Sequence, residues 1–155
     1  MRRLTLIVLT GAALVMTAAQ PTGFVHWKAG ELKGFGAKLA PKMDAKKVAT
    51  EQLGKFGNHL VMVAHREGSG EAEVHDTQAD IFIVEEGEAT LAHGGEVVDP
   101  KTTAPGEIRG PSIRGGEKTR IAAGDIIHIP VKEPHQLLLA PGAKFTYAIV
   151  KVDVQ

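Results

Sequence analysis

Two stretches of the chain place carboxylate and imidazole side chains at spacings that suit a metal ion. Glu73 and His75 are two positions apart, so on a β-strand both side chains point to the same face. Asp80 follows closely, and His135 lies in a second stretch much further along the chain. Imidazole and carboxylate together suit manganese, iron, zinc or nickel. The sequence therefore predicts a divalent metal site formed by Glu73, His75, Asp80 and His135.

The charges of these residues support a cation between them. Burying Glu73 and Asp80 side by side without a cation is costly, so inward-facing carboxylates require a metal or a shared proton. Two alternatives stay open. The carboxylates face solvent, or His75 and His135 are buried polar residues whose hydrogen bonds are satisfied without metal.

Four further residues are candidates for a substrate pocket or for completing the metal site. His65 lies in an apolar stretch predicted to be a strand, and His128 alternates with isoleucines in another. Gln78 contributes a metal ligand if its loop bends so that Glu73 or Asp80 reaches the ion poorly. Arg109, in a loop rich in glycine and proline, either binds an anionic substrate or is simply solvated.

The first 19 residues read as an export signal, because a basic start, an apolar run from 4 to 16 and the small residues Thr17-Ala18-Ala19 occur together. The run is shorter than the ~20 apolar residues of a comfortable transmembrane helix. We therefore expect a periplasmic or secreted protein with no stable membrane anchor after cleavage. An uncleaved N-terminal anchor is the alternative.

Composition limits the remaining function classes. A chain of 155 residues with 43% hydrophobic residues is large enough for one domain with a buried core. Basic and acidic residues number 18 each, with no basic run, so nucleic acid is not expected as a partner. The chain has no cysteine, which excludes disulfides and thiolate ligands.

Hydrophobic periodicity predicts one short helix followed by many strands. Leu32, Phe35 and Leu39 recur at helical steps within 29–40, and Pro41 would end that helix. Residues 44–53 fit a helix or a strand, and we favour a strand. Beyond residue 55 the short apolar runs are separated by glycine, proline and acidic residues, and they predict strands at 59–65, 80–86, 89–93, 119–122, 126–129, 136–139 and 144–152. Residues 99–117 read as a long loop or irregular hairpin.

The two metal-site stretches resemble the two sequence motifs of the cupin superfamily. In the second motif, Gly124, Pro130 and His135 fall at the family spacing, whereas Lys132 stands where the family has glycine. Leu139 replaces the family asparagine. The resemblance covers most of residues 55–152.

The first motif departs from the family in its metal ligands. Aligned on Gly87, Asp80 takes the family glutamate position, His75 the second histidine and Glu73 the first. The resemblance then implies two carboxylates and two imidazoles, a harder set that favours manganese or iron over copper. Zinc and nickel stay open, as does Gln78 in place of Glu73.

The resemblance implies an all-β fold: a cupin-type double-stranded β-helix, or jelly-roll barrel, with a short N-terminal helical arm. The expected organisation is a signal peptide at 1–19, an arm with a short helix and an edge strand at 20–55, and a cupin barrel at 56–155. The stretch Gly106-Glu-Ile-Arg-Gly110 is also similar to a loop of small exported bacterial cupins.

Two functions from different classes follow from these observations. In the first, a divalent metal in the barrel acts on a small anionic or carbonyl-containing molecule. In the second, the barrel binds a small molecule or metal without turnover. This fold hosts both classes, so the sequence leaves catalysis undecided. A small molecule is the expected partner, and a homodimer stays open.

Overall fold

The computed structural model describes residues 23–154. The predicted export signal at 1–19 therefore lies outside the described residues. The elements run in the order α1 (Ala29–Leu39), η1 (Ala40–Lys42), β1 (Val48–Phe56), β2 (His59–Arg66), β3 (Ala72–His75), β4 (Gln78–His93), β5 (Glu96–Val97), β6 (Lys101–Ala104), β7 (Glu107–Gly110), β8 (Ile113–Arg114), β9 (Glu117–Ala122), β10 (Ile126–Ile129), β11 (His135–Leu138) and β12 (Phe145–Asp153).

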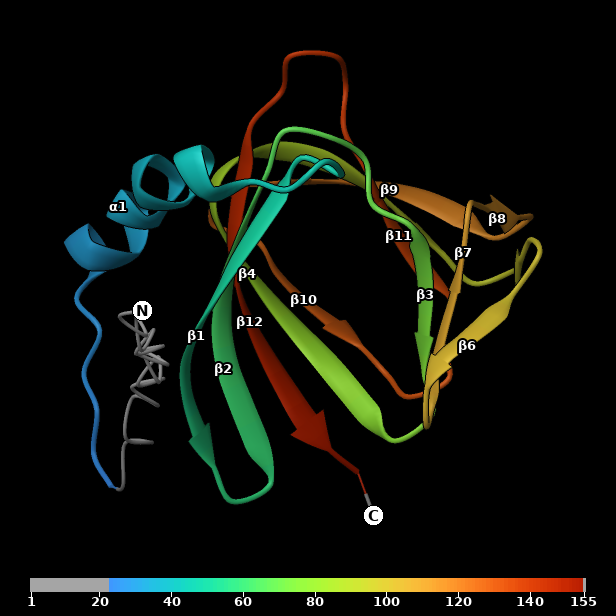
Figure 1. The fold of residues 1–155 in the computed structure, drawn as a ribbon, viewed down its shortest axis with the longest axis horizontal. Coiled ribbons are helices and arrows are strands. Elements are labelled where there is room, and N and C mark those ends of the chain that lie inside the picture. Colours follow the sequence, from blue (N-terminus) through green and yellow to red (C-terminus); the bar gives the residue numbers. More distant parts are fainter. Residues whose placement is uncertain (1–22, 155) are drawn as a thin grey trace, which may run out of the picture.

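The predicted helix is confirmed. α1 ends at Leu39, and Pro41 lies in the single 3₁₀ turn η1 that follows, where proline cannot supply an N–H to continue the α-helix. Phe35 and Leu39 are buried and form a core cluster with Ala49, Val63 and Ala148. The helix therefore covers the outer face of β1, β2 and β12, as Figure 1 shows at the left of the molecule.

The long strand β4 joins two facing sheets. Its first half pairs with β12 on one edge and with β10 on the other. Its second half pairs with β11 and β9. Gly87 lies between these halves with φ +82°, a conformation that favours glycine. The sequence predicted two strands here, at 80–86 and 89–93, and the structure shows one strand that bends at Gly87 and passes between sheets (Figure 1).

One sheet is completed by β1 and β2, and β1 forms its edge beside β2. This confirms a strand, not a helix, in the region of 44–53. The other sheet continues from β11 through β3 and β7 to β6. Residues 99–117 form the irregular hairpin β6–β7, followed by β8. β3 is not among the strands predicted from apolar runs, although the expected metal site places Glu73 and His75 on a strand.

The main core lies between the two sheets. Inward-facing residues from both sheets pack there, and they include Phe82, Val84, Leu91, Ile121, Ile129, Leu137, Phe145, Tyr147 and Ile149. The fold is all-β with one short helix, as predicted. Within residues 23–154 no helix is long and apolar enough to span a membrane.

Candidate metal centre

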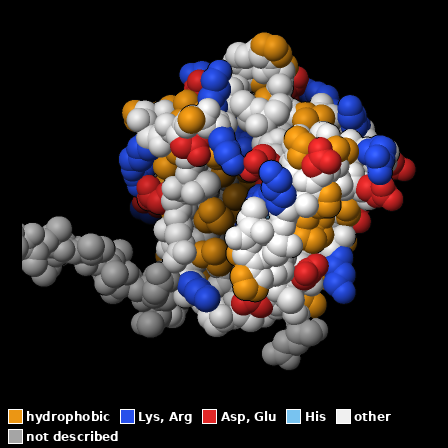
Figure 2. Space-filling view, turned by 45° about the vertical axis from the view of Figure 1, so that its right-hand side comes forward, with side chains coloured by type: hydrophobic (Ala, Val, Ile, Leu, Met, Phe, Trp, Pro, Cys, Tyr) orange, Lys and Arg blue, Asp and Glu red, His pale blue; other side chains and the backbone are white. Residues whose placement is uncertain are grey.

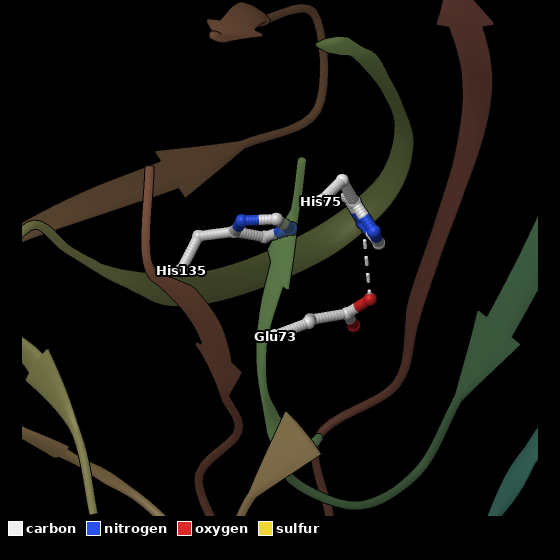
Figure 3. A group of neighbouring side chains, drawn as sticks. All are labelled: Glu73, His75 and His135. Atoms are coloured by element: carbon white, nitrogen blue, oxygen red, sulfur yellow. Dashed lines mark ion pairs between the residues drawn. The ribbon is translucent and has the colours of Figure 1, made fainter. Parts of the chain in front are cut away.

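Three of the predicted ligands converge between the sheets. Glu73 and His75 lie on β3, two positions apart, and His135 lies on the neighbouring strand β11 directly opposite Glu73. Opposite residues of paired strands project to the same face, so all three side chains point into the barrel. Figure 3 shows them directed toward one another. Each offers one ligand atom, and these atoms lie within 4.8 Å of one another.

His135 has one nitrogen available for a ligand. Its Nδ1 lies 3.0 Å from the carbonyl oxygen of Glu133, so Nδ1 carries the proton and donates to that oxygen. Its Nε2 is buried and is the one such side-chain atom among the described residues with no hydrogen-bond partner. Burial also lowers the pKa of His135, which keeps the imidazole neutral. A neutral imidazole with an unpaired, buried lone pair is ready to bind a metal.

Glu107 orients His75. It lies opposite His75 on β7, and both of its carboxylate oxygens are 2.8 Å from His75 Nδ1. Nδ1 therefore donates to Glu107, and Nε2 faces the site interior, 3.4 Å from Glu73 Oε2. A carboxylate behind a ligating histidine fixes the ring and raises its basicity.

The surrounding charges set the protonation of His75 and Glu73. Burial lowers the pKa of His75, but the hydrogen bonds to Asp80 and Glu73 outweigh burial and raise that pKa to about 9. Burial raises the pKa of Glu73, but the hydrogen bond to His75 and the charge of Arg109 outweigh it, and the pKa falls to about 2. At neutral pH Glu73 is therefore ionised, and the proton on His75 must leave when a metal binds.

Asp80 lies beside this group, but a lysine holds it. Lys151 stands opposite Asp80 on β12, and its Nζ is 2.9 and 3.0 Å from the two carboxylate oxygens. The same ammonium is 3.0 Å from His75 Nε2. Asp80 Oδ2 is 3.4 Å from His75 Nε2 and 3.8 Å from His135 Nε2. Lys151 and the protonated His75 thus both place positive charge beside the clustered carboxylates.

The donor set fits a divalent ion. Glu73, His75 and His135 provide one carboxylate and two imidazoles whose ligand atoms lie within 4.8 Å of one another, a donor set suited to a divalent ion. Of the four expected ligands, the structure thus brings three together, and the fourth, Asp80, lies beside them in an ion pair with Lys151.

The other predicted pocket residues lie elsewhere. His65 is buried outside the barrel interior, under α1, where its Nδ1 is 2.9 Å from Thr146 Oγ1. The side-chain amide of Gln78 donates to Asp153 near the surface. His128 is exposed and lines a separate cavity of about 270 Å³ with the inward-facing Ile127 and Ile129.

Arg109 lies at the site, but as a partner of acids. Its guanidinium pairs with Glu73, and it is 3.2 Å from Glu107. Glu73 is the cross-strand partner of Arg109 on β3, and Glu107 lies two residues before Arg109 on β7, on the same face of the strand. Its charge therefore steadies the ligand carboxylate.

Sequence reasoning missed Glu107 and Lys151. Lys151 carried a usable signal, because it continues the alternation of Phe145, Tyr147 and Ile149, which face the core on β12. Glu107 offered none, because its role depends on the register between β3 and β7.

Comparison with known proteins shows the fold. No protein-family model and no curated protein matches the chain. Among solved structures, an uncharacterized conserved protein with a double-stranded beta-helix domain from Klebsiella pneumoniae aligns with TM-score 0.57 and 17% identity, over 84% of this chain and 91% of that chain. TT1209 from Thermus thermophilus aligns with TM-score 0.54 and 16% identity, over 77% and 94%. A variant of PAC13 from Streptomyces, solved with uridine, aligns with TM-score 0.52 and 9% identity, over 73% and 75%.

These likenesses define a class of fold. The chain has a double-stranded β-helix fold, as the sequence resemblance implied. Its barrel carries a group of two histidines and one glutamate that suits a metal ion.

Proposed function

We propose that this protein is an exported cupin that binds one divalent metal ion through Glu73, His75 and His135 and presents it to a small molecule. The observation that carries the proposal is the buried, unpartnered Nε2 of His135, directed at the other two side chains. An uncompensated buried polar atom is costly, so its presence beside a carboxylate and a second imidazole supports a ligand there.

Manganese or iron is the favoured ion. Two imidazoles and one carboxylate with free coordination positions are typical of non-haem iron(II) sites, and the carboxylate disfavours copper. When bound, such an ion polarises a carbonyl or anionic oxygen of a small molecule. Zinc and nickel are the weaker candidates.

The chain's own residues have distinct tasks in this proposal. Glu107 holds the His75 ring with its Nε2 toward the site, and the Glu133 carbonyl does the same for His135. Arg109 keeps Glu73 ionised and in place. The apolar walls formed by Phe82 and its neighbours limit water in the barrel. The same geometry would also allow the barrel to bind a small molecule without converting it. Detection of a product formed from the bound molecule would distinguish an enzyme from a binding protein.

The test is metal content after dialysis against manganese, read by elemental analysis and by the electron paramagnetic resonance signal of Mn²⁺. We expect about one ion per chain in the wild-type protein and none in His135→Gln. His128→Gln is the matched control, because His128 is exposed and outside the group. Equal metal in the wild type and His135→Gln would refute the site.

We also propose that residues 1–19 are removed on export. Sequencing the N-terminus of protein recovered from the periplasm or medium should give Gln20 first. A mature chain that still begins with Met1 would contradict this proposal.

A further inference from the structure

A cavity of about 440 Å³ opens beside the metal group. Glu73 and Arg109 line it together with Arg66 at the end of β2, residues 69–71 of the β2–β3 connection, and Lys46 and Val48 at the start of β1. Its volume lies in the range of small-molecule pockets. Because Glu73 belongs both to this cavity and to the metal group, a molecule in the cavity lies next to the proposed ion. Figure 2 shows one face of the molecule, with Lys, Arg, Asp and Glu side chains around a hollow that has hydrophobic side chains inside it.

Most charges in the cavity wall are already paired. Arg109 binds Glu73 and Glu107. Lys46 binds Glu71, with Nζ 2.7 Å from Oε2. The sequence left open whether Arg109 binds an anion, and the structure shows that two carboxylates already compensate its charge.

Arg66 differs from these cations. It is the last residue of β2 and follows the inward alternation of Met62 and Ala64. Its Nε donates to the Tyr147 hydroxyl at 3.1 Å, which fixes the guanidinium plane. Within residues 23–154, its two terminal nitrogens have no hydrogen-bond partner and no carboxylate within ion-pair distance. An arginine is always charged, and Glu73 and Asp44 act on this half-buried charge without hydrogen-bonding to it, so its terminal N–H groups remain available to an anion.

Gly70 makes room at these nitrogens. A Cβ at Gly70 would lie 3.1 Å from Arg66 Nη1, tighter than an ordinary contact, and 3.5 Å from Nη2, an ordinary contact. A side chain there would press on the guanidinium. With glycine in place, the fork-shaped donor face of Arg66 stays open to the cavity that both residues line.

We propose that Arg66 binds the carboxylate of a small organic acid and thereby directs the other end of that molecule to the metal group. This inference rests on the proposed metal-binding function and specifies its substrate class. The planar guanidinium matches a carboxylate with two parallel hydrogen bonds. The neighbouring acids Glu71 and Glu73 oppose a more highly charged anion, so a single negative charge complements the single unpaired cation.

The metal ion that we propose at Glu73 determines which chemical group the other end of the acid should carry. A carbonyl or hydroxyl oxygen suits a manganese or iron ion bound there. The expected substrate is therefore a short monocarboxylic acid that carries a carbonyl or hydroxyl group away from its carboxylate.

The test uses levulinate, a keto acid with its ketone remote from the carboxylate, and its uncharged methyl ester. Calorimetric titration should show levulinate binding to the metal-free wild-type protein and tighter binding after manganese loading. Arg66→Gln should weaken binding at least about tenfold in both forms, because charge-assisted hydrogen bonds are lost. The control Arg120→Gln, at an exposed arginine of β9 paired with Glu88, should not change it. The methyl ester should bind as weakly to the wild type as levulinate binds to Arg66→Gln.

Arg66→Lys keeps the positive charge but loses the fork, and we expect an affinity between those of the wild type and Arg66→Gln. Thermal unfolding of both variants verifies that they are folded. Equal affinity of the wild type and Arg66→Gln, equal affinity for acid and ester, or no levulinate binding to the wild type would each overturn the inference.

Failure of this inference is distinguishable from failure of the metal proposal. Stoichiometric manganese without Arg66-dependent levulinate binding refutes the carboxylate site alone. Arg66-dependent levulinate binding to a protein that holds no manganese refutes the metal proposal alone.

Discussion

At the scale of single residues, Lys151 and the proposed metal ion would compete for the same position. Its ammonium is within 3.0 Å of His75 Nε2, the nitrogen that would face the ion, and it also holds Asp80. A metal bound to that nitrogen must displace Lys151. We therefore expect the lysine to oppose metal binding.

Replacing Lys151 with methionine should raise manganese affinity by about tenfold or more, because a positive charge leaves the site and Asp80 becomes free to bind the ion. Methionine keeps the apolar stem that packs in the barrel. Competition titration against a chelator measures the change. Lys144→Met, at an exposed lysine paired with Glu67, is the control. An unchanged or lower affinity in Lys151→Met would show that the ammonium does not oppose the metal.

Metal affinity should also depend on pH through His75. The pKa of His75 is raised to about 9, so at lower pH the imidazole holds a proton that the metal must displace. The pKa of His135 is lowered, and that of Glu73 falls to about 2, so neither gains a proton near neutrality. Apparent manganese affinity should therefore rise by about tenfold per pH unit from roughly pH 7 to 8. Affinity that is flat across this window would place His75 outside the ligand set.

The ligand types could be predicted from sequence because they sit in local patterns. The two-position spacing of Glu73 and His75 places them on one face of any strand, and the structure confirms it. The roles of Asp80 and Arg109 could not be predicted, because the residues that hold them, Lys151 and Glu73, meet them only through strand register. Such register is a property of the whole sheet, and one sequence does not encode it locally.

At the scale of elements, β4 shows the same limit. Its glycine and acidic residues near position 87 look like a break, and local pattern does not distinguish a bend within a strand from a turn between strands. The structure shows that the strand continues, because partners from both sheets hold its two halves. The positive φ at Gly87 lets one strand pass between the two sheets.

Gly87→Ala should destabilise the fold by about 3 kcal/mol or more. Alanine is strained at positive φ, and its Cβ would overlap the carbonyl oxygen of Lys144. Gly124→Ala is the matched control, because Gly124 also has positive φ (+96°) but has no atom within 4 Å of the position that a Cβ would take. The control should lose only the backbone contribution, about 1–2 kcal/mol. Urea unfolding measures both, and equal losses would show that Gly87 provides conformational freedom alone.

At the scale of the whole molecule, the candidate ligands lie on short neighbouring strands of the second sheet. Its three ligands come from the neighbouring strands β3 and β11, and the β7 residue Glu107 supports one of them. β3 has only four residues, and β11 has four as well. An ion held by residues of both strands would cross-link them.

Metal binding should therefore be visible in the stability of the entire fold. An ion that binds only the native state, at a concentration of about 100 times its Kd, adds about 2.7 kcal/mol to the free energy of unfolding. For a chain of this size that corresponds to a rise in Tm of roughly 5–10 °C. Calorimetry of the wild-type protein with manganese should show the rise, and His135→Gln should not. A rise of equal size in both proteins would mean that manganese stabilises the barrel from somewhere other than the histidine–glutamate group.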